Sequence, residues 1–444
     1  MKSILTLVTA LAVWNANAQC WQTLSAGSGH SVVIQSDGTA WSWGSNFSGQ
    51  LGDGTNTNRN YPAKVGNENN WQSLSYGCNY TNTVAIKSDG SLWRWVSNDG
   101  GETISQTGTD NNWEFVASGT GYYAALKTDG TLWTWGNNMY GCLGNGTDSS
   151  NFTPTQLGTD TWISTAAGTS HTLGIKSDGT LWAWGQNFYG QLGDGTNTDR
   201  FVPVQIGTAS NWEQVIAGGY FSIAKKNDGS LWSWGINSEG QLGNTAAPMA
   251  NVPAKIGLDN NWAYISAGYN LVAGIKTDGS LWTWGDNSWG QLGIANNYPT
   301  VPFPYRVGTQ NDWQAIDHGN AHTLALKTDG TLWAWGHNNL GQLGDHTNTD
   351  RNYPVPVLCL PLGTQSNTGA ASFKLYPNPV QHTLYFSKDG YIIDGITVTD
   401  LSGQTLLSKQ GNMDELNVTG LATGIYFLKV TAHGKTSMQK FIKN

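Results

Sequence analysis

Histidines are the first residues to consider for catalysis or metal binding, and three of the eight share one repeated position. His30, His171 and His322 occupy that position in three copies of a repeat, and the other copies carry Tyr80, Tyr122, Phe221 and Leu271. A position that accepts Phe and Leu serves packing or hydrogen bonding. The chain also lacks HExxH, CxxC, GxSxG and phosphate-loop motifs. The sequence therefore predicts no catalytic residue, no bound metal and no cofactor.

Carboxylates are abundant, but turn chemistry explains their pattern. Seven Asp-Gly pairs recur, and Asp before Gly is a hairpin signal because Asp bonds to its own backbone while Gly accepts positive φ. The polar stretch Gly52–Arg59 recurs as Gly193–Arg200 and Gly344–Arg351. Its oxygen-rich composition suggests calcium, yet the spacing differs from that of an EF-hand. We expect loops held by their own side chains, with the final arginine of each stretch as a brace.

The elements that position these residues belong to a sevenfold repeat. Lys327–Gly336 reads KTDGTLWAWG, and close copies of this decamer, each with a Trp-x-Trp, recur at steps of 40 to 52 residues. Such a period is typical of solenoids and propellers. Tryptophans two residues apart on a strand point to one face, so we expect the paired rings to fill the spaces between sheets. The paired tryptophans are Trp41/Trp43, Trp93/Trp95, Trp133/Trp135, Trp182/Trp184, Trp232/Trp234, Trp282/Trp284 and Trp333/Trp335.

Each copy contains four strand-like segments, which in the fourth copy are Trp162–Ala167, His171–Lys176, Thr180–Trp184 and Pro203–Ile206. Helical periodicity is absent. Four short strands in about 50 residues are the pattern of a propeller blade. The sequence thus predicts an all-β fold in which residues 19–360 form a propeller.

The repeat resembles that of the regulator of chromosome condensation. The shared motif runs from a first Trp through Asp-Gly and Trp-x-Trp-Gly to Gly-Gln-Leu-Gly, which stands at 49–52, 190–193, 240–243, 290–293 and 341–344, with a variant at 141–144. The resemblance implies a seven-bladed β-propeller.

The second copy departs from this pattern. Val96 follows Trp95, Gly-Gln-Leu-Gly is missing, and the stretch from Trp95 to the next opening tryptophan, Trp113, is much shorter than the stretch from Trp43 to Trp71. Blade decay on a tolerant edge is the preferred interpretation, and a gap opened for a partner is the alternative.

The ends of the chain indicate export. Residues 1–18 have the charge, apolar run and Ala-x-Ala site of a secretory signal peptide, and Gln19 before Cys20 disfavours lipidation. Residues 361–372 read as a linker. Residues 373–444 resemble a type IX secretion C-terminal sorting domain in Phe373–Val380, Gly424–Val430 and Gln439–Asn444. That resemblance implies a small β-sandwich recognised by an outer-membrane translocon.

These segments predict a protein without a membrane span that passes through the periplasm and across the outer membrane, to be secreted or held at the cell surface. Disulfides are permitted there. In a closed ring Cys20 and Cys359 would meet, so we expect a bond that clasps the seam and stabilises the fold by up to about 5 kcal/mol in the chain-entropy model. Cys78 and Cys142, in loops at the same end of neighbouring blades, either form a second bond or stay as free thiols.

Charge argues against nucleic acid as a partner. The whole chain carries −8; the signal contributes +1 and residues from 361 contribute +2, which leaves −11 on the propeller. A DNA-binding face needs clustered Lys and Arg to neutralise phosphates. The chromatin-binding and GTPase-exchange roles of the eukaryotic family are disfavoured for the same reason, and by export.

Binding surfaces are expected where the repeats diverge on exposed loops. The loop before the second strand and the loop after Trp-x-Trp emerge at one end of each blade. Exposed aromatics there favour protein interfaces and also stack on sugars. The candidate binding residues are Phe47, Tyr140, Phe188, Tyr189, Tyr220, Tyr269 and Trp289.

The sequence predicts a non-enzymatic binding propeller that recognises an extracellular protein through one loop face. A secreted β-lactamase-inhibiting propeller with the same repeat is similar in size and supports this by analogy. A carbohydrate-binding or adhesive surface protein is the alternative. An enzyme with chemistry among loop carboxylates and a structural part of the cell coat are further alternatives.

Overall fold

The computed structural model describes residues 21–75, 82–95, 104–244, 248–357, 373–388, 393–400, 404–411, 413, 415–432 and 435–443. The chain divides into two compact units, one of residues 19–359 and one that includes the residues from 360 onward. Every regular element in these ranges is a strand, and no helix in them could cross a membrane.

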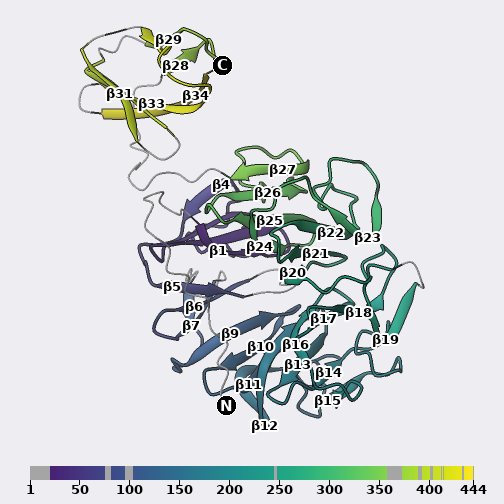
Figure 1. Cartoon of the computed structure of the whole chain (residues 1–444). Coiled ribbons are helices and arrows are strands. Elements are labelled where there is room, and N and C mark those ends of the chain that lie inside the picture. Colours follow the sequence, from purple (N-terminus) through teal and green to yellow (C-terminus); the bar gives the residue numbers. More distant parts are fainter. Residues whose placement is uncertain are drawn as a thin grey trace. The chain divides into compact units, whose positions relative to one another are not determined.

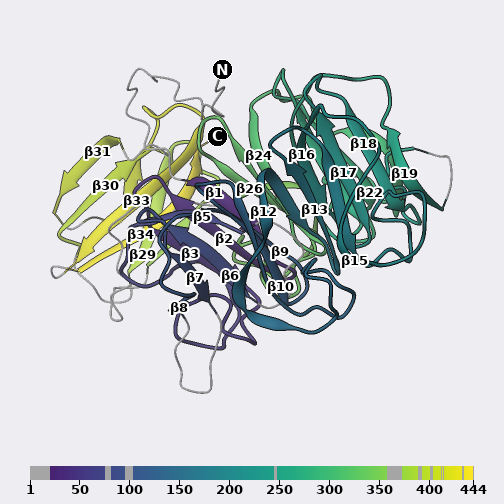
Figure 2. The same cartoon turned by 90° about the horizontal axis from the view of Figure 1, so that it is seen from below.

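The first unit consists of seven blades of four antiparallel strands, followed from purple to green in Figure 1 and from below in Figure 2. Blades 1 to 3 contain β1 (Trp21–Ala26), β2 (His30–Gln35), β3 (Ala40–Gly44), β4 (Arg59–Lys64); β5 (Trp71–Leu74), β6 (Thr83–Lys87), β7 (Leu92–Trp95), β8 (Ile104–Gln106); β9 (Trp113–Ser118), β10 (Tyr122–Lys127), β11 (Thr131–Gly136) and the first part of β12 (Asn151–Ala167).

The remaining part of β12 is the inner strand of blade 4, so this one strand joins blades 3 and 4 into a seven-stranded sheet. Blades 4 to 7 then contain β13 (His171–Lys176), β14 (Leu181–Gly185), β15 (Arg200–Gln205); β16 (Trp212–Ala217), β17 (Phe221–Lys226), β18 (Leu231–Ile236), β19 (Met249–Lys255); β20 (Trp262–Ala267), β21 (Leu271–Lys276), β22 (Leu281–Asp286), β23 (Thr300–Arg306); β24 (Trp313–His318), β25 (His322–Lys327), β26 (Leu332–Gly336) and β27 (Arg351–Val357).

The second and third strands of each blade are joined by the predicted Asp-Gly turn. In blade 4, Asp178 Oδ1 accepts hydrogen bonds from the amide and the hydroxyl of Thr180, at 3.0 and 2.6 Å. Gly179 has φ of 81°, and a Cβ there would lie 2.3 Å from the Ser210 carbonyl oxygen. Only glycine fits both conditions, so this turn explains the aspartate without any role in catalysis.

The tryptophans divide into two groups. The opening Trp of each copy and the second Trp of each pair are buried, as expected. The first Trp of each pair is only half-buried and packs against the edge of a core cluster, so the expectation that both paired rings fill the core holds only in part for this one. Its outer side also contacts a lysine: in blade 4, Lys176 Nζ lies 3.7 Å from the centroid of the Trp182 ring and 2.8 Å from Asp160 Oδ2.

In six blades a backbone carbonyl connects the blade to the next one. In blade 4 this is the Gln191 carbonyl of Gly-Gln-Leu-Gly, which accepts the indole N–H of Trp234 at 2.8 Å and the hydroxyl of Ser222 at 2.7 Å. Both acceptor sites of a buried oxygen are therefore used. The same pair of bonds reaches the carbonyl oxygens of Cys142, Gln291 and Gln342.

The same contacts close the ring between blades 7 and 1. Trp43 and Ser31 of blade 1 both donate to the Gln342 carbonyl, at 2.9 and 2.7 Å. The amide of Ala26 donates to Asp317 Oδ2 at 2.9 Å, and Ser266 of blade 6 donates to the other oxygen at 3.0 Å. Burial raises the pKa of Asp317 to about 7 in spite of these donors. Trp21, Leu24 and Trp43 share one core with Leu324, Leu332 and Leu343.

The three histidines of the shared repeat position reinforce these junctions. Nε2 of His30, His171 and His322 lies 2.9 to 3.0 Å from a Ser or Thr hydroxyl of the following blade. Because each hydroxyl gives its single proton to a carbonyl, the imidazole must donate from Nε2. Burial lowers the pKa of His30 to about 4 and those of His171 and His322 to about 3. The position is therefore structural, as the sequence indicated.

The second unit is a small two-sheet structure. Its sheets contain β28 (Phe373–Tyr376), β29 (Thr383–Lys388) and β32 (Glu415–Asn417), and β31 (Thr405–Gln410), β30 (Gly395–Thr399), β33 (Gly424–Ala432) and β34 (Lys435–Lys443). Val380, Leu384, Val398, Leu428 and Phe441 belong to its core. The predicted β-sandwich is present.

The buried histidines predict a loss of propeller stability in acid. His171 has a folded-state pKa well below the 6.5 of an unfolded His, so the unfolded state binds the proton first and stability falls as pH decreases below 6.5. We expect His171→Phe, which copies Phe221 of blade 5, to reduce the slope of stability between pH 6 and 4.5 by about 1.4 kcal/mol per pH unit. Denaturant titrations followed by tryptophan fluorescence measure this slope. Parallel curves for the two proteins would contradict the assignment.

Candidate functional site

The candidate site lies at one end of the blades. Since the four strands alternate in direction, the loops between first and second strands and those between third and fourth strands emerge together. The Asp-Gly turns and the connections between blades lie at the opposite end. Adjacent loops at the candidate end are joined by backbone hydrogen bonds, from Thr169 N to Gly219 O at 3.1 Å and from Gly219 N to Tyr269 O at 2.9 Å.

In six of the blades, a buried asparagine fixes the loop that follows the paired tryptophans. Asn187 Nδ2 donates to Asp194 Oδ1 and to the carbonyls of Thr196 and Thr198, at 3.1 to 3.2 Å, and its Oδ1 accepts the amide of Leu192 at 3.0 Å. A single side chain thus satisfies polar groups along most of the irregular loop between β14 and β15. Phe188, the next residue, is 66% exposed on this fixed loop.

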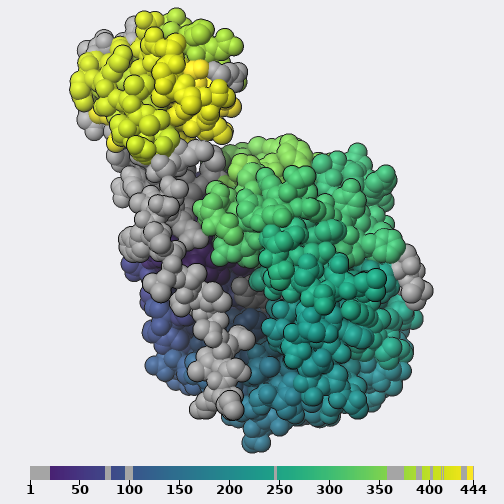
Figure 3. Space-filling view, in the orientation of Figure 1, coloured from purple at the N-terminus to yellow at the C-terminus, as the bar shows by residue number. Residues whose placement is uncertain are grey.

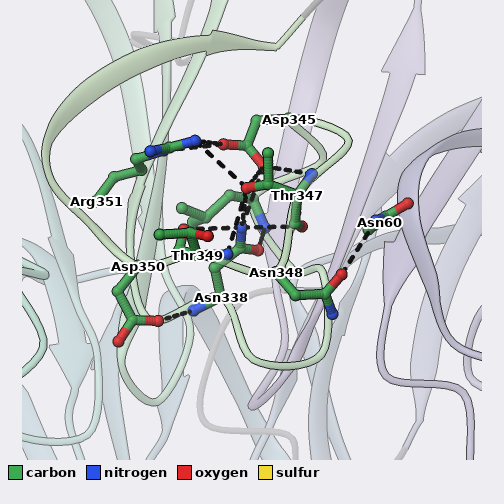
Figure 4. A network of polar contacts seen from close by, with 9 residues as sticks. Asn60, Asn338, Asp345, Thr347, Asn348, Thr349, Asp350 and Arg351 are labelled. Atoms are coloured by element: carbon green, nitrogen blue, oxygen red, sulfur yellow. Dashed lines mark hydrogen bonds and ion pairs between the residues drawn. The ribbon is translucent and has the colours of Figure 1, made fainter.

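Arginines brace three of these loops as predicted. Arg59, Arg200 and Arg351 pair with the aspartates six residues earlier, at 2.5, 2.6 and 2.9 Å. Figure 4 shows the blade 7 loop, in which Asn338 and Arg351 donate to the two carboxylate oxygens of Asp345. In the same loop, Asn348 accepts a hydrogen bond from Asn60 of blade 1 at 3.0 Å. Among the described residues no group of His, Cys, Asp or Glu could hold a metal ion. These three loops are held by their own side chains, as the sequence predicts.

Four of the seven candidate residues form a continuous aromatic track across blades 4 to 6. Phe188 packs edge-on against Tyr189 with ring centroids 4.9 Å apart, Tyr189 contacts Tyr220 at 5.3 Å, and Tyr220 contacts Tyr269 at 5.8 Å. Such edge-to-face contacts are favourable. The loops of three blades are therefore connected through side chains as well as backbone.

The other three candidates lie outside this track. Trp289 is 48% exposed and packs on His337 of blade 7, with ring centroids 4.1 Å apart. Phe47 of blade 1 is exposed and Tyr140 of blade 3 is half-buried. Neither ring contacts another aromatic ring within the described ranges. Figure 3 shows that the surface of the teal and green blades is continuous.

Sequence reasoning missed two exposed residues of these loops. Met139 occupies the same repeat position as Phe47 and Phe188, and Tyr298 belongs to the corresponding loop of blade 6. Met139 is not aromatic, so the pattern of divergent aromatic residues does not include it. Alignment of the residue after each buried asparagine would have found it.

Only one of the four cysteines lies within the described residues. Cys142 is a free, buried thiol whose Sγ lies 3.1 Å from the Asn137 carbonyl oxygen. Of the two alternatives given by the sequence, a second disulfide or free thiols, the structure shows a free thiol at Cys142. Cys20, Cys78 and Cys359 lie outside the described residues, so the Cys20–Cys359 bond stays a prediction.

Comparisons with known proteins agree with the fold. Residues 103–390 match the RCC1-like domain family, residues 21–50 and 37–84 match the RCC1 repeat, and residues 374–444 match the secretion system C-terminal sorting domain. Both resemblances inferred from the sequence are thus confirmed.

Individual relatives share the propeller fold at low identity. Human WBSCR16 has a TM-score of 0.63 with 22% identity, covering 72% of this chain and 93% of that one. Yeast RCC1 (Prp20), solved bound to Kap60, has a TM-score of 0.65 with 18% identity, covering 84% and 93%. An X-linked retinitis pigmentosa GTPase regulator homolog of Caenorhabditis elegans is 37% identical over 82 residues, which span 18% of this chain and 6% of the relative.

The asparagine anchor predicts the local stability of the binding loop. Asn187→Ala leaves buried loop amides and carbonyls without partners, which costs about 1–3 kcal/mol. We expect faster amide exchange throughout residues 186–200 and little change elsewhere in the propeller, measured by hydrogen–deuterium exchange. Asn197→Ala, which removes an exposed amide of the same loop, is the control. Equal exchange in both variants would exclude the anchoring role.

Burial of Cys142 predicts an unreactive thiol. Burial raises its pKa to about 12, so the nucleophilic thiolate is scarce at pH 8. We expect iodoacetamide to leave Cys142 unmodified in the native protein and to alkylate it in denaturant, measured by peptide mass spectrometry. Rapid labelling of the native protein would contradict the buried position.

Proposed function

Because this chain belongs to the RCC1-like domain family and carries a C-terminal sorting domain for export by type IX secretion, we propose that it is an exported binding propeller. Its partner is an extracellular protein, which it contacts with the loop end that carries the aromatic track. The observation that supports this most is the presentation of large apolar side chains on loops anchored by buried asparagines.

The energetics of this surface suit a protein partner. Exposed Phe47, Met139, Phe188 and Trp289 offer apolar area whose burial is favourable once water is excluded. Because the loops are already ordered, little conformational entropy is lost on binding. Aromatic and Met side chains are also enriched in the buried centres of protein interfaces.

A protein fits the track better than a sugar does. Tyr189, Tyr220 and Tyr269 pack edge-on or tilted against one another and are half-buried. Stacking on sugars requires open ring faces, and edge-to-face packing covers part of each face. The carbohydrate-binding alternative therefore depends mainly on Trp289.

The proposed activity is binding without catalysis, nucleic acid or nucleotide exchange. The repeat histidines are held neutral between blades, and the hairpin aspartates accept hydrogen bonds from their own turns. The propeller carries −11, which disfavours a phosphate backbone. The human and yeast relatives are only 22% and 18% identical, so their roles do not transfer with the fold.

Affinity capture from the native growth medium tests the proposal. We expect the immobilised full chain to retain a specific protein, and the double variant Phe188→Ala, Trp289→Ala to retain at least tenfold less because two exposed anchors are lost. Leu258→Ala removes an exposed apolar residue from a connection at the opposite end and should retain as much as the wild type.

A glycan array probed with the same three proteins distinguishes the alternative. Sugar binding that the double variant abolishes, together with protein capture that it leaves unchanged, would overturn protein recognition in favour of carbohydrate binding.

A further inference from the structure

The outer strands of the blades are exposed sheet edges, and six of the seven are blocked in the same way. Unpaired edge strands can recruit another strand, and proline prevents this because it has no N–H to donate. The strand register aligns one position in every blade, two residues before the partner of the first paired Trp. The prolines at this position are Pro62, Pro154, Pro203, Pro253, Pro304 and Pro354.

Blade 2 carries Ile104 at this position. The register of β7 with β8 pairs Trp93 with Gln106, which places Ile104 in line with the six prolines. β8 is the last strand of its sheet, and no strand within the described residues pairs with its outer side. Among the seven outer strands, only β8 therefore has a backbone N–H at the position where the other six have proline.

The direction of the Ile104 N–H follows from a neighbouring hydrogen bond between β8 and β7. Thr107 N donates inward to Leu92 O at 2.8 Å, and Val65, Ile206, Ile256 and Val307 make the corresponding bond in other blades. Because inward and outward groups alternate along a strand, Ile104 and Gln106 direct their N–H and C=O outward. The outward direction also explains why proline is tolerated at this position in the other blades.

The side chain of Ile104 keeps this edge in place. It is half-buried and packs, with Trp93, against the core that contains Trp71, Leu74 and Trp95. Gln106 is exposed. The edge is thus a fixed strand with four outward backbone groups.

The outer strand of blade 3 also carries a more exposed aromatic residue than the outer strand of blade 4. Eight residues separate β7 from β8, whereas fourteen separate β3 from β4, and Gly-Gln-Leu-Gly is missing. Elsewhere this motif covers the next outer strand: a Cβ on Gly141 would lie 2.7 Å from the Phe201 ring. Phe152 occupies the position of Phe201 in blade 3 and is 76% exposed, against 39% for Phe201.

We infer that the outer edge of blade 2 is a strand-addition site, at which an extended segment of a partner polypeptide pairs with Ile104 and Gln106 as a fifth strand. The outward N–H and C=O groups of Ile104 and Gln106 are spaced as in a β-strand. The backbone of an extended peptide carries donors and acceptors at the same spacing and can pair with them. The shortened second repeat then serves as the opening for a partner. This site is separate from the aromatic track and does not depend on it.

A displayed library of random decapeptides, selected on the wild-type full chain and then measured against Ile104→Pro, tests the inference. Ile104→Pro restores the residue found in the other six blades, so the fold should persist. Gln106→Pro is a second variant, since blade 7 carries Pro356 at that register. We expect selected peptides to bind both variants at least tenfold more weakly than wild type.

Two further measurements identify strand pairing. N-methylation along the peptide should weaken binding at alternate residues only, because alternate amides face the protein. The double variant Phe188→Ala, Trp289→Ala should bind these peptides normally, which separates this site from the proposed protein-binding face. Peptides that bind the proline variants as well as wild type, a library without such peptides, or an N-methyl scan without alternation would overturn the inference.

Discussion

A buried carbonyl oxygen that accepts two hydrogen bonds from the neighbouring blade is the constraint on which the ring depends. Gln191 shows it most clearly, with an indole and a hydroxyl from blade 5 on one oxygen. A sheet-to-sheet core of Leu, Ile and Val gives stability without fixing register, whereas directed bonds to one atom fix the rotation between blades. The glycines of Gly-Gln-Leu-Gly allow the chain to deliver that oxygen, since Gly193 has φ of 78° and lies against the Trp234 ring.

The exception at blade 2 supports this view. Blade 2 lacks the Gly-Gln-Leu-Gly motif that supplies this carbonyl elsewhere. Blade 3 has Tyr123 at the position where five blades place a Ser or Thr hydroxyl and blade 6 places Val272. Tyr123 stacks on Trp135 with ring centroids 5.2 Å apart, and its hydroxyl accepts a hydrogen bond from Asn82 at 3.0 Å. A larger side chain thus occupies the junction where the motif is missing. The change in one blade is matched by a change in the next, while the outer edge of blade 2 stays open.

The sequence predicted the features that repeat and missed those that depend on contacts between copies. The Asp-Gly turns, the sevenfold ring and the arginine braces follow from local chemistry, and all are present. The lysine beside Trp182 was not foreseen, because its position becomes meaningful only when β13 and β14 pair. Contact between Tyr189 and Tyr220 depends on the rotation between blades 4 and 5, and alignment of Ile104 with the prolines depends on strand register. Neither the aromatic contact nor this alignment can be read from residue spacing in the sequence.

The exchange of indole N–H protons with water tests the closed ring most directly. In protein labelled with ¹⁵N-tryptophan, the indole of Trp43 reports the seam, since it donates to Gln342 across the junction of blades 7 and 1. The account predicts that Trp43 exchanges as slowly as Trp234, at the rate of global unfolding. Exchange of Trp43 that is orders of magnitude faster than that of Trp234 would show that the seam opens independently, and would contradict a ring closed by these bonds.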